Sequence, residues 1–268
     1  MNRQVGYWHL ARRVFAILFC LFMLAPLVVI LAVSFTNEGY VRFPPGSFGL
    51  RWYVAALQNP YFQSGLIVSV QIALLVALVS GTLGVLASLV LGRYEFPGRS
   101  AILSALLMPM AIPHIVIAIS LLQFMSLLAL PSAPVGIIIG HILISLPFVL
   151  RLTMTSVVAL DPLAERASYS LGASPLQTLR YVILPMIAPG AAAGTVFAFL
   201  ISFDEVTISL FLALPGHTTL PAEIFSFASQ GSDPVITAVS GAMIIFAVLL
   251  MLLVERFYGV LRLMTERR

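Results

Sequence analysis

The sequence predicts an all-α, polytopic membrane protein with six transmembrane helices. Of its 268 residues, 60% are hydrophobic and 9% are charged, whereas soluble domains carry about 25% charged residues. Six apolar stretches are each long enough to cross about 30 Å of hydrocarbon at about 1.5 Å per residue. These stretches cover residues 14–35, 66–92, 101–130, 135–156, 187–214 and 236–261.

The first stretch, 14–35, follows Arg12-Arg13 and could be mistaken for a twin-arginine export signal. Its apolar run is too long for the hydrophobic region of a signal peptide, and no A-x-A cleavage site follows it. We therefore expect an uncleaved first span. The third stretch contains Pro109 and Pro113, so we expect a broken or kinked helix, or a span joined to a short outer helix.

The fourth and fifth stretches each carry two glycines four residues apart, Gly136/Gly140 and Gly190/Gly194. That spacing places both glycines on one helix face and allows a neighbouring helix to approach closely. We interpret these faces as packing surfaces inside the bundle.

Arginine placement predicts the orientation of the chain. All 14 basic residues are arginine, and the side of the membrane with more basic loop residues is normally the cytoplasm. With the N-terminus inside, only Arg42 and Arg51 lie outside. We therefore expect a cytoplasmic segment at 1–13, a six-span domain at 14–261, a cytoplasmic loop at 157–186 and a cytoplasmic tail at 262–268.

Composition excludes several functions. A phosphate-binding P-loop needs a lysine, and this chain has none, so any ATP must be hydrolysed by another polypeptide. The single cysteine, Cys20, cannot form an internal disulfide. The four histidines are scattered over different segments, which disfavours a metal site. The net charge of +4 reflects arginines at span ends and does not indicate nucleic-acid binding.

The most informative polar segment lies in loop 157–186. Asp161 can cap a helix, Gly172 can end it in a left-handed turn, Ser174 can cap a second helix, and Pro185 would stop that helix. One face of the first helix carries Leu163, Ala167 and Leu171, and Ala167 with Ser168 leaves a small surface for close approach. From the residues alone, this segment could dock a soluble partner or rest on lipid headgroups.

The segment resembles the EAA loop of ABC-importer permease subunits, in which a coupling helix fits a groove of an ATPase subunit. Aligned on Gly172, the Glu-Ala-Ala positions hold Arg166, Ala167 and Ser168, and the later Leu-Pro of the motif falls at Leu184-Pro185. Glu165 lies one residue early. Because Arg166 replaces the usual acid, one polar contact with the ATPase that the family pattern implies is in question. The resemblance implies that the ATPase-coupling residues are Glu165, Arg166, Ala167, Ser168, Leu171, Gly172, Leu184 and Pro185.

Other segments resemble the spermidine/putrescine-type branch of this family, namely residues 43–48, Trp52-Tyr53, Leu146-Pro147-Phe148 and residues 201–205. The resemblance implies a type I ABC-importer permease fold in a bacterial inner membrane, with no catalytic residue or cofactor in this chain. It implies three partners: an ATPase dimer that holds ATP and Mg, a second homologous permease and a periplasmic solute-binding protein. The implied solute is a polyamine, or else an amino-acid derivative, an opine or an aminophosphonate.

Asp204 and Glu205 fall within the fifth stretch, where a charged side chain at mid-bilayer costs at least ~2.5–3.5 kcal/mol. We expect at least one of them, preferably Asp204, to line a solute pathway and attract a cationic amine. A packing hydrogen bond or an interfacial position is the alternative. His114 and Trp52 are further pathway candidates. The polyamine branch that the chain resembles often has an acid near this position, and His114 departs from that pattern. His114 could instead be a hydrogen-bonded histidine at a helix break.

Two other classes of membrane protein are alternatives to an ABC-importer permease. An ion-driven secondary transporter could use Asp204 and Glu205 as a cation site, but it would leave the 163–185 segment unexplained. A membrane enzyme or assembly factor would need an acid–base, nucleophile or metal constellation on one side of the membrane, and the sequence offers none.

Overall fold

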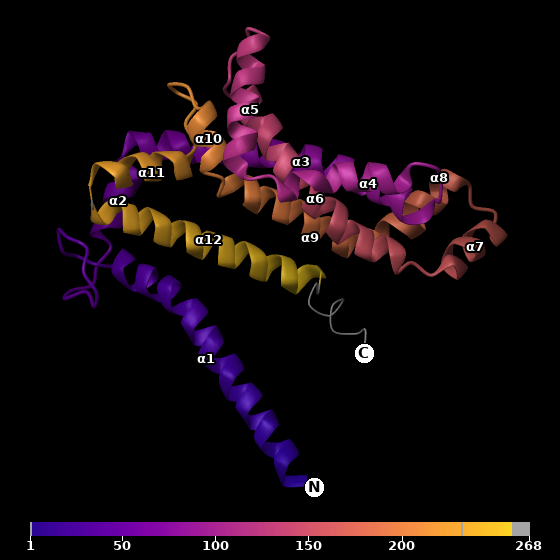
Figure 1. Ribbon diagram of the computed structural model, residues 1–268, viewed down its shortest axis with the longest axis horizontal. Helices are drawn as coiled ribbons and strands as arrows, with labels where there is room; N and C mark the ends of the chain where they lie inside the picture. Colours follow the sequence, from indigo (N-terminus) through magenta and orange to yellow (C-terminus); the bar gives the residue numbers. More distant parts are fainter. Residues whose placement is uncertain (1, 232, 259–268) are drawn as a thin grey trace. The chain divides into compact units, whose positions relative to one another are not determined.

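A computed structural model describes residues 2–231 and 233–258 (Figure 1). The chain forms two compact units, Met1–Pro60 with Ser226–Val248 and Tyr61–Phe225 with Leu249–Arg268. The described part is nearly all helical, as predicted, and its one β-bridge joins Thr36 to Phe48.

The first unit holds α1 (Asn2–Ser34), α2 (Arg51–Gln58) and the first part of α12 (Pro234–Tyr258). The Tyr53 hydroxyl lies 2.8 Å from Ser34 Oγ and so connects α2 to the end of α1. A Cβ placed on Gly241 would lie 2.6 Å from Ser34 Cβ, so α12 approaches α1 closely only because residue 241 is glycine.

The second unit is built around an antiparallel pair, α6 (Val135–Val158) and α9 (Leu184–Phe203). A Cβ on Gly194 would lie 2.9 Å from Val149 Cα, and one on Gly190 would lie 2.7 Å from the carbonyl oxygen of Leu152. The predicted packing role of these two glycines is confirmed, because both meet the backbone of α6. Such contact is a main source of helix association in lipid.

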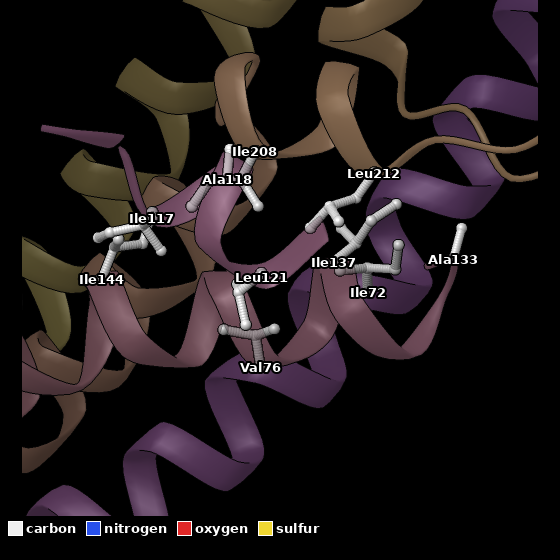
Figure 2. Close-up of a cluster of buried hydrophobic side chains, with 10 residues drawn as sticks. All are labelled: Ile72, Val76, Ile117, Ala118, Leu121, Ala133, Ile137, Ile144, Ile208 and Leu212. Atoms are coloured by element: carbon white, nitrogen blue, oxygen red, sulfur yellow. The ribbon is translucent and has the colours of Figure 1, made fainter. Parts of the chain in front are cut away.

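Four helices of this unit meet in one apolar cluster: α3 (Pro60–Arg93), α5 (His114–Leu127), α6 and α10 (Thr207–Leu212). A Cβ on Gly140 would lie 2.7 Å from Ile208 Cγ2, so the small residue lets α10 pack on α6. Figure 2 shows the cluster, whose buried side chains are Ile72, Val76, Ile117, Ala118, Leu121, Ala133, Ile137, Ile144, Ile208 and Leu212.

Among the residues that the structure describes, five helices are long and apolar enough to cross a membrane, and a bent pair makes a sixth if it counts as one span. The pair is α4 (Arg99–Leu107), with its 3-10 turn Met108–Ala111, followed by α5, and it bends by 103°. The break expected in the third stretch is therefore present. Pro113 lies directly before α5 and has no N–H to continue the preceding helix.

The fifth stretch departs from its predicted bounds of 187–214, because its helix runs over Pro175–Phe203. The prediction that Pro185 stops this helix is wrong. Instead α8 (Pro175–Thr178) continues through a π-helical segment, Leu179–Ile183, into α9. The wider π turn relieves the clash between the proline ring and the carbonyl four residues earlier.

Beyond Phe203 the helix is interrupted until α10 begins at Thr207. Asp204 and Glu205 therefore lie at a helix break and not inside a continuous span, which corrects the prediction. A short helix, α11 (Leu220–Gln230), lies between α10 and α12, and its first N–H donates to Ser69 Oγ at 2.8 Å. The predicted tail at 262–268 lies outside the described residues.

Candidate functional site

The polar segment between α6 and α9 folds as two capped helices. Asp161 Oδ1 accepts a hydrogen bond from the Leu163 N–H at 2.9 Å and caps α7 (Pro162–Ser170). Gly172 ends the first helix with a φ of 84°. Ser174 and Gln177 form a reciprocal capping box at the start of α8. All three predicted caps are confirmed, because each depends on residues within a few positions of one another.

The two faces of α7 have different surroundings. Leu163 and Leu171, which are 66% and 89% exposed, lie on the outward face with Arg166 and Ala167, which are also exposed. Ser168 points inward instead and lies 2.9 Å from Thr178 Oγ1. The expectation that Ser168 adds to an approachable small surface is therefore wrong, since its hydroxyl joins α7 to α8.

Glu165 also turns toward the rest of the unit. Arg93, the last residue of α3, donates a hydrogen bond to Glu165 Oε2, and the Tyr169 hydroxyl lies 3.3 Å from Glu165 Oε1. Sequence reasoning missed Arg93, because nothing in the sequence indicates that the end of α3 lies beside α7. The last two coupling candidates, Leu184 and Pro185, lie exposed at the start of α9.

A cavity of about 350 Å³ lies beneath α7. It is lined by the inward side of α7, the ends of α3 and α6 and the π-helical segment, including Arg93, Val157, Glu165, Ile183 and Met186. Beside this space, the Arg93–Glu165 ion pair and the Ser168–Thr178 hydrogen bond connect α7 to the rest of the unit.

The break after α9 places two neighbouring carboxylates in different surroundings. Glu205 is buried, with its Oε2 lying 2.9 Å from His114 Nδ1 and its Oε1 accepting the Ile208 N–H at 3.0 Å. Asp204 is exposed, and its carboxylate makes no hydrogen bond or ion pair with any residue that the structure describes. The structure thus brings Glu205 and His114 together, whereas the carboxylate of Asp204 stays exposed.

His141 occupies the interior of the same unit and is fully buried. Its Nδ1 lies 2.8 Å from Ser202 Oγ and its Nε2 lies 3.2 Å from Ser209 Oγ. Both ring nitrogens therefore have partners, one from α9 and one from α10, and His141 acts in helix packing.

Trp52 belongs to the first unit, in α2. Its Nε1 donates to the carbonyl of Glu38 at 2.8 Å, and the Arg51 guanidinium lies 4.9 Å from its ring centre. Together with Phe227 and Asp233 it lines a cavity of about 440 Å³. Within residues 2–231 and 233–258 no group of three or more histidine, cysteine or acidic side chains could hold a metal ion.

Comparison with known proteins identifies the family. Residues 84–263 match the model for the "Binding-protein-dependent transport system inner membrane component". The spermidine/putrescine transport system permease protein PotC of Haemophilus influenzae is 29% identical over 90% of this chain and 94% of its own length. The putrescine transport system permease protein PotI of Escherichia coli K12 is 30% identical over 82% of this chain and 80% of its own length.

A solved structure shows the same fold. A chain in the crystal structure of a bacterial ABC transporter that imports the acidic polysaccharide alginate matches with a TM-score of 0.71 and 18% identity, over 96% of this chain and 99% of that one. The relatives are inner-membrane permease subunits and not enzymes. The chain therefore belongs to the family of binding-protein-dependent transport system inner membrane components, the permease subunits of ABC importers.

Proposed function

We propose that this chain forms half of the translocation pathway of an ATP-driven importer and that α7 and α8 couple it to the ATPase. The observation that carries the proposal is the capped two-helix segment, which presents an exposed apolar face between two membrane helices. Family membership supports it, because the ATPase of such importers is a separate chain. Both termini and loop 157–186 would be cytoplasmic, in agreement with the arginine distribution.

The contacts of α7 suggest how movement of the ATPase reaches the pathway. Arg93 connects α7 to the end of α3, and Ser168 connects it to α8 and so to α9. The other end of α9 is the break that carries Asp204 and Glu205. In Figure 1, α7 and α10 lie at opposite ends of the α6–α9 pair. A displacement of α7 would therefore act on the helix that positions the carboxylates.

The two carboxylates would have separate tasks. Glu205 contacts His114 through Oε2 and accepts the Ile208 N–H through Oε1, so it holds the break in shape. Asp204 is left to attract an ammonium group of the solute by Coulomb interaction. A cationic amine is the solute that this arrangement fits, and the names of the polyamine-transporting relatives support putrescine or spermidine. An aminophosphonate, an opine or an amino-acid derivative also carries an amine and is the second candidate.

Uptake into proteoliposomes tests this function. The complex would be purified with its ATPase, second permease and binding protein, and loaded with ATP inside the vesicles when it is reconstituted. We expect ATP-dependent uptake of labelled putrescine or spermidine and no uptake without ATP. Uptake of an amino-acid derivative or aminophosphonate, without uptake of putrescine or spermidine, would assign the solute to that class instead. Uptake driven by an ion gradient in the absence of ATP would overturn the importer assignment.

A further inference from the structure

The outward face of α7 carries one charge, placed between apolar side chains. Residues at the helical spacing i, i+3, i+4, i+7 and i+8 lie on one face of a helix. Here these positions hold Leu163, Arg166, Ala167, Ser170 and Leu171, and all five are exposed. Arg166 makes no side-chain hydrogen bond or ion pair within the described part of the chain.

No free acid balances Arg166 on this face. Glu165 points about 100° away around the helix, where Arg93 and Tyr169 bind its two oxygens. Asp161 precedes the helix, and its carboxylate accepts the Leu163 N–H. A partner that covers Leu163 and Leu171 must therefore bury the guanidinium of Arg166 between them.

We propose that Arg166 docks against a carboxylate in an apolar groove of the ATPase subunit, an inference that rests on the proposed function. Burying an arginine without a partner is strongly unfavourable, so a groove that accepts the leucines must offer it an acid. Arginine is also enriched in the buried centres of protein interfaces.

The arrangement fits a protein groove better than a lipid surface. Helices that lie on a membrane place their basic residues on the polar face, from which the charge reaches the headgroups. Arg166 lies in the middle of the apolar face, and the opposite face of α7 is bonded to α3 and α8. The caps at Asp161, Gly172 and Ser174 also give the segment a fixed shape.

Charge reversal tests the inference in the intact complex. Arg166→Glu should lower the affinity of the permease for the ATPase by roughly 30-fold or more, as for truncated buried charge pairs. Arg166→Lys, which keeps the positive charge, should lower this affinity less. The matched control is Arg180→Glu, which makes the same charge change at an exposed arginine of the π-helical segment. This variant should leave the affinity for the ATPase unchanged. Affinity would be measured in detergent, with melting temperature as the check on folding.

The second arm restores the pair. Each Asp and Glu in the groove of the ATPase would be changed to Arg, and one of these variants should recover binding to Arg166→Glu. Unchanged binding by Arg166→Glu, or an equal loss in Arg180→Glu, would overturn the inference. Loss of binding to vesicles of anionic lipid in place of loss of ATPase would assign Arg166 to the membrane. If the wild-type chain retains no ATPase at all, the proposed function itself fails.

Discussion

At the residue scale, the clearest division of roles is between Asp204 and Glu205. The sequence predicts that one of two adjacent acids faces the solute, but not that a helix break separates their surroundings. At that break Glu205 contacts His114, which lies 91 positions earlier in the chain. A pattern within a few residues cannot indicate such a partner, so the role of Glu205 could not be predicted.

The two acids should respond differently to loss of charge. Asp204→Asn should raise the KM for uptake of a cationic amine, because the variant loses one attractive charge. The expected rise is about tenfold, which corresponds to about 1.4 kcal/mol. The matched variant Glu205→Gln should instead lower thermal stability, by about 1–3 kcal/mol, because it disturbs a buried hydrogen-bonded group. Uptake kinetics and melting in detergent would be compared. Normal KM in Asp204→Asn would return Asp204 to a packing or interfacial role.

Gly172 makes a second prediction at this scale. Its φ of 84° is strained for any side chain with a branched Cβ. Gly172→Val should cost about 1–2 kcal/mol locally and reorient α7 relative to α8, so uptake should fall while membrane insertion persists. Gly39→Val is the control, because Gly39 also has open space around it but no left-handed φ. Equal uptake by both variants and the wild type would show that the turn is not needed for coupling.

At the element scale, the sequence predicts local structure better than helix ends. The caps of α7 and α8 follow from neighbouring residues, and the apolar stretches follow from composition. The continuation of the helix past Pro185 could not be predicted, because proline normally ends a helix and no local pattern indicates the π-helical segment Leu179–Ile183 that precedes it. The contact of Arg93 with Glu165 could not be predicted either, because the two residues lie far apart in the sequence.

The α6–α9 pair gives a stability prediction. Gly194→Ala should destabilise the protein by about 1–3 kcal/mol, because its Cβ would lie 2.9 Å from the backbone of α6 at Val149. Gly136→Ala is the control, since the atoms nearest to its Cβ would belong to the side chains of Met125 and Leu212, at 3.4 Å or more. Thermal melting in detergent measures both. A melting temperature that falls as much in the control as in Gly194→Ala would contradict the close packing of these helices.

The attachment of α7 gives a further prediction. Arg93→Ala removes a half-buried ion pair worth about 1 kcal/mol, so amides of α7 should exchange hydrogen about fivefold faster. ATP hydrolysis should also become less dependent on solute delivery. Tyr169→Phe, which removes only the longer contact to Glu165, should exchange as the wild type does. Unchanged exchange in Arg93→Ala would mean that other contacts hold α7.

At the scale of the whole molecule, hydrophobic length predicts a polytopic protein with six spans, and the resemblance of the 163–185 segment implies an inner-membrane permease. The described helices supply five spans, or six if the bent pair is one span, and the family agrees with the permease assignment. Orientation of the termini stays a prediction. The solute could not be assigned from this chain, because a second permease and a binding protein would supply the remaining surfaces that meet it. The ATPase groove is likewise outside the sequence, and only the charge of Arg166 indicates what it contains.

Co-purification from native membranes would show whether this chain works together with an ATPase. Tagged protein would be extracted in mild detergent, and its partners identified by mass spectrometry. We expect an ATP-binding-cassette ATPase and a second permease of similar size among these partners. Recovery of the chain alone, or as a homo-oligomer without an ATPase, would contradict the coupling role of α7 and α8.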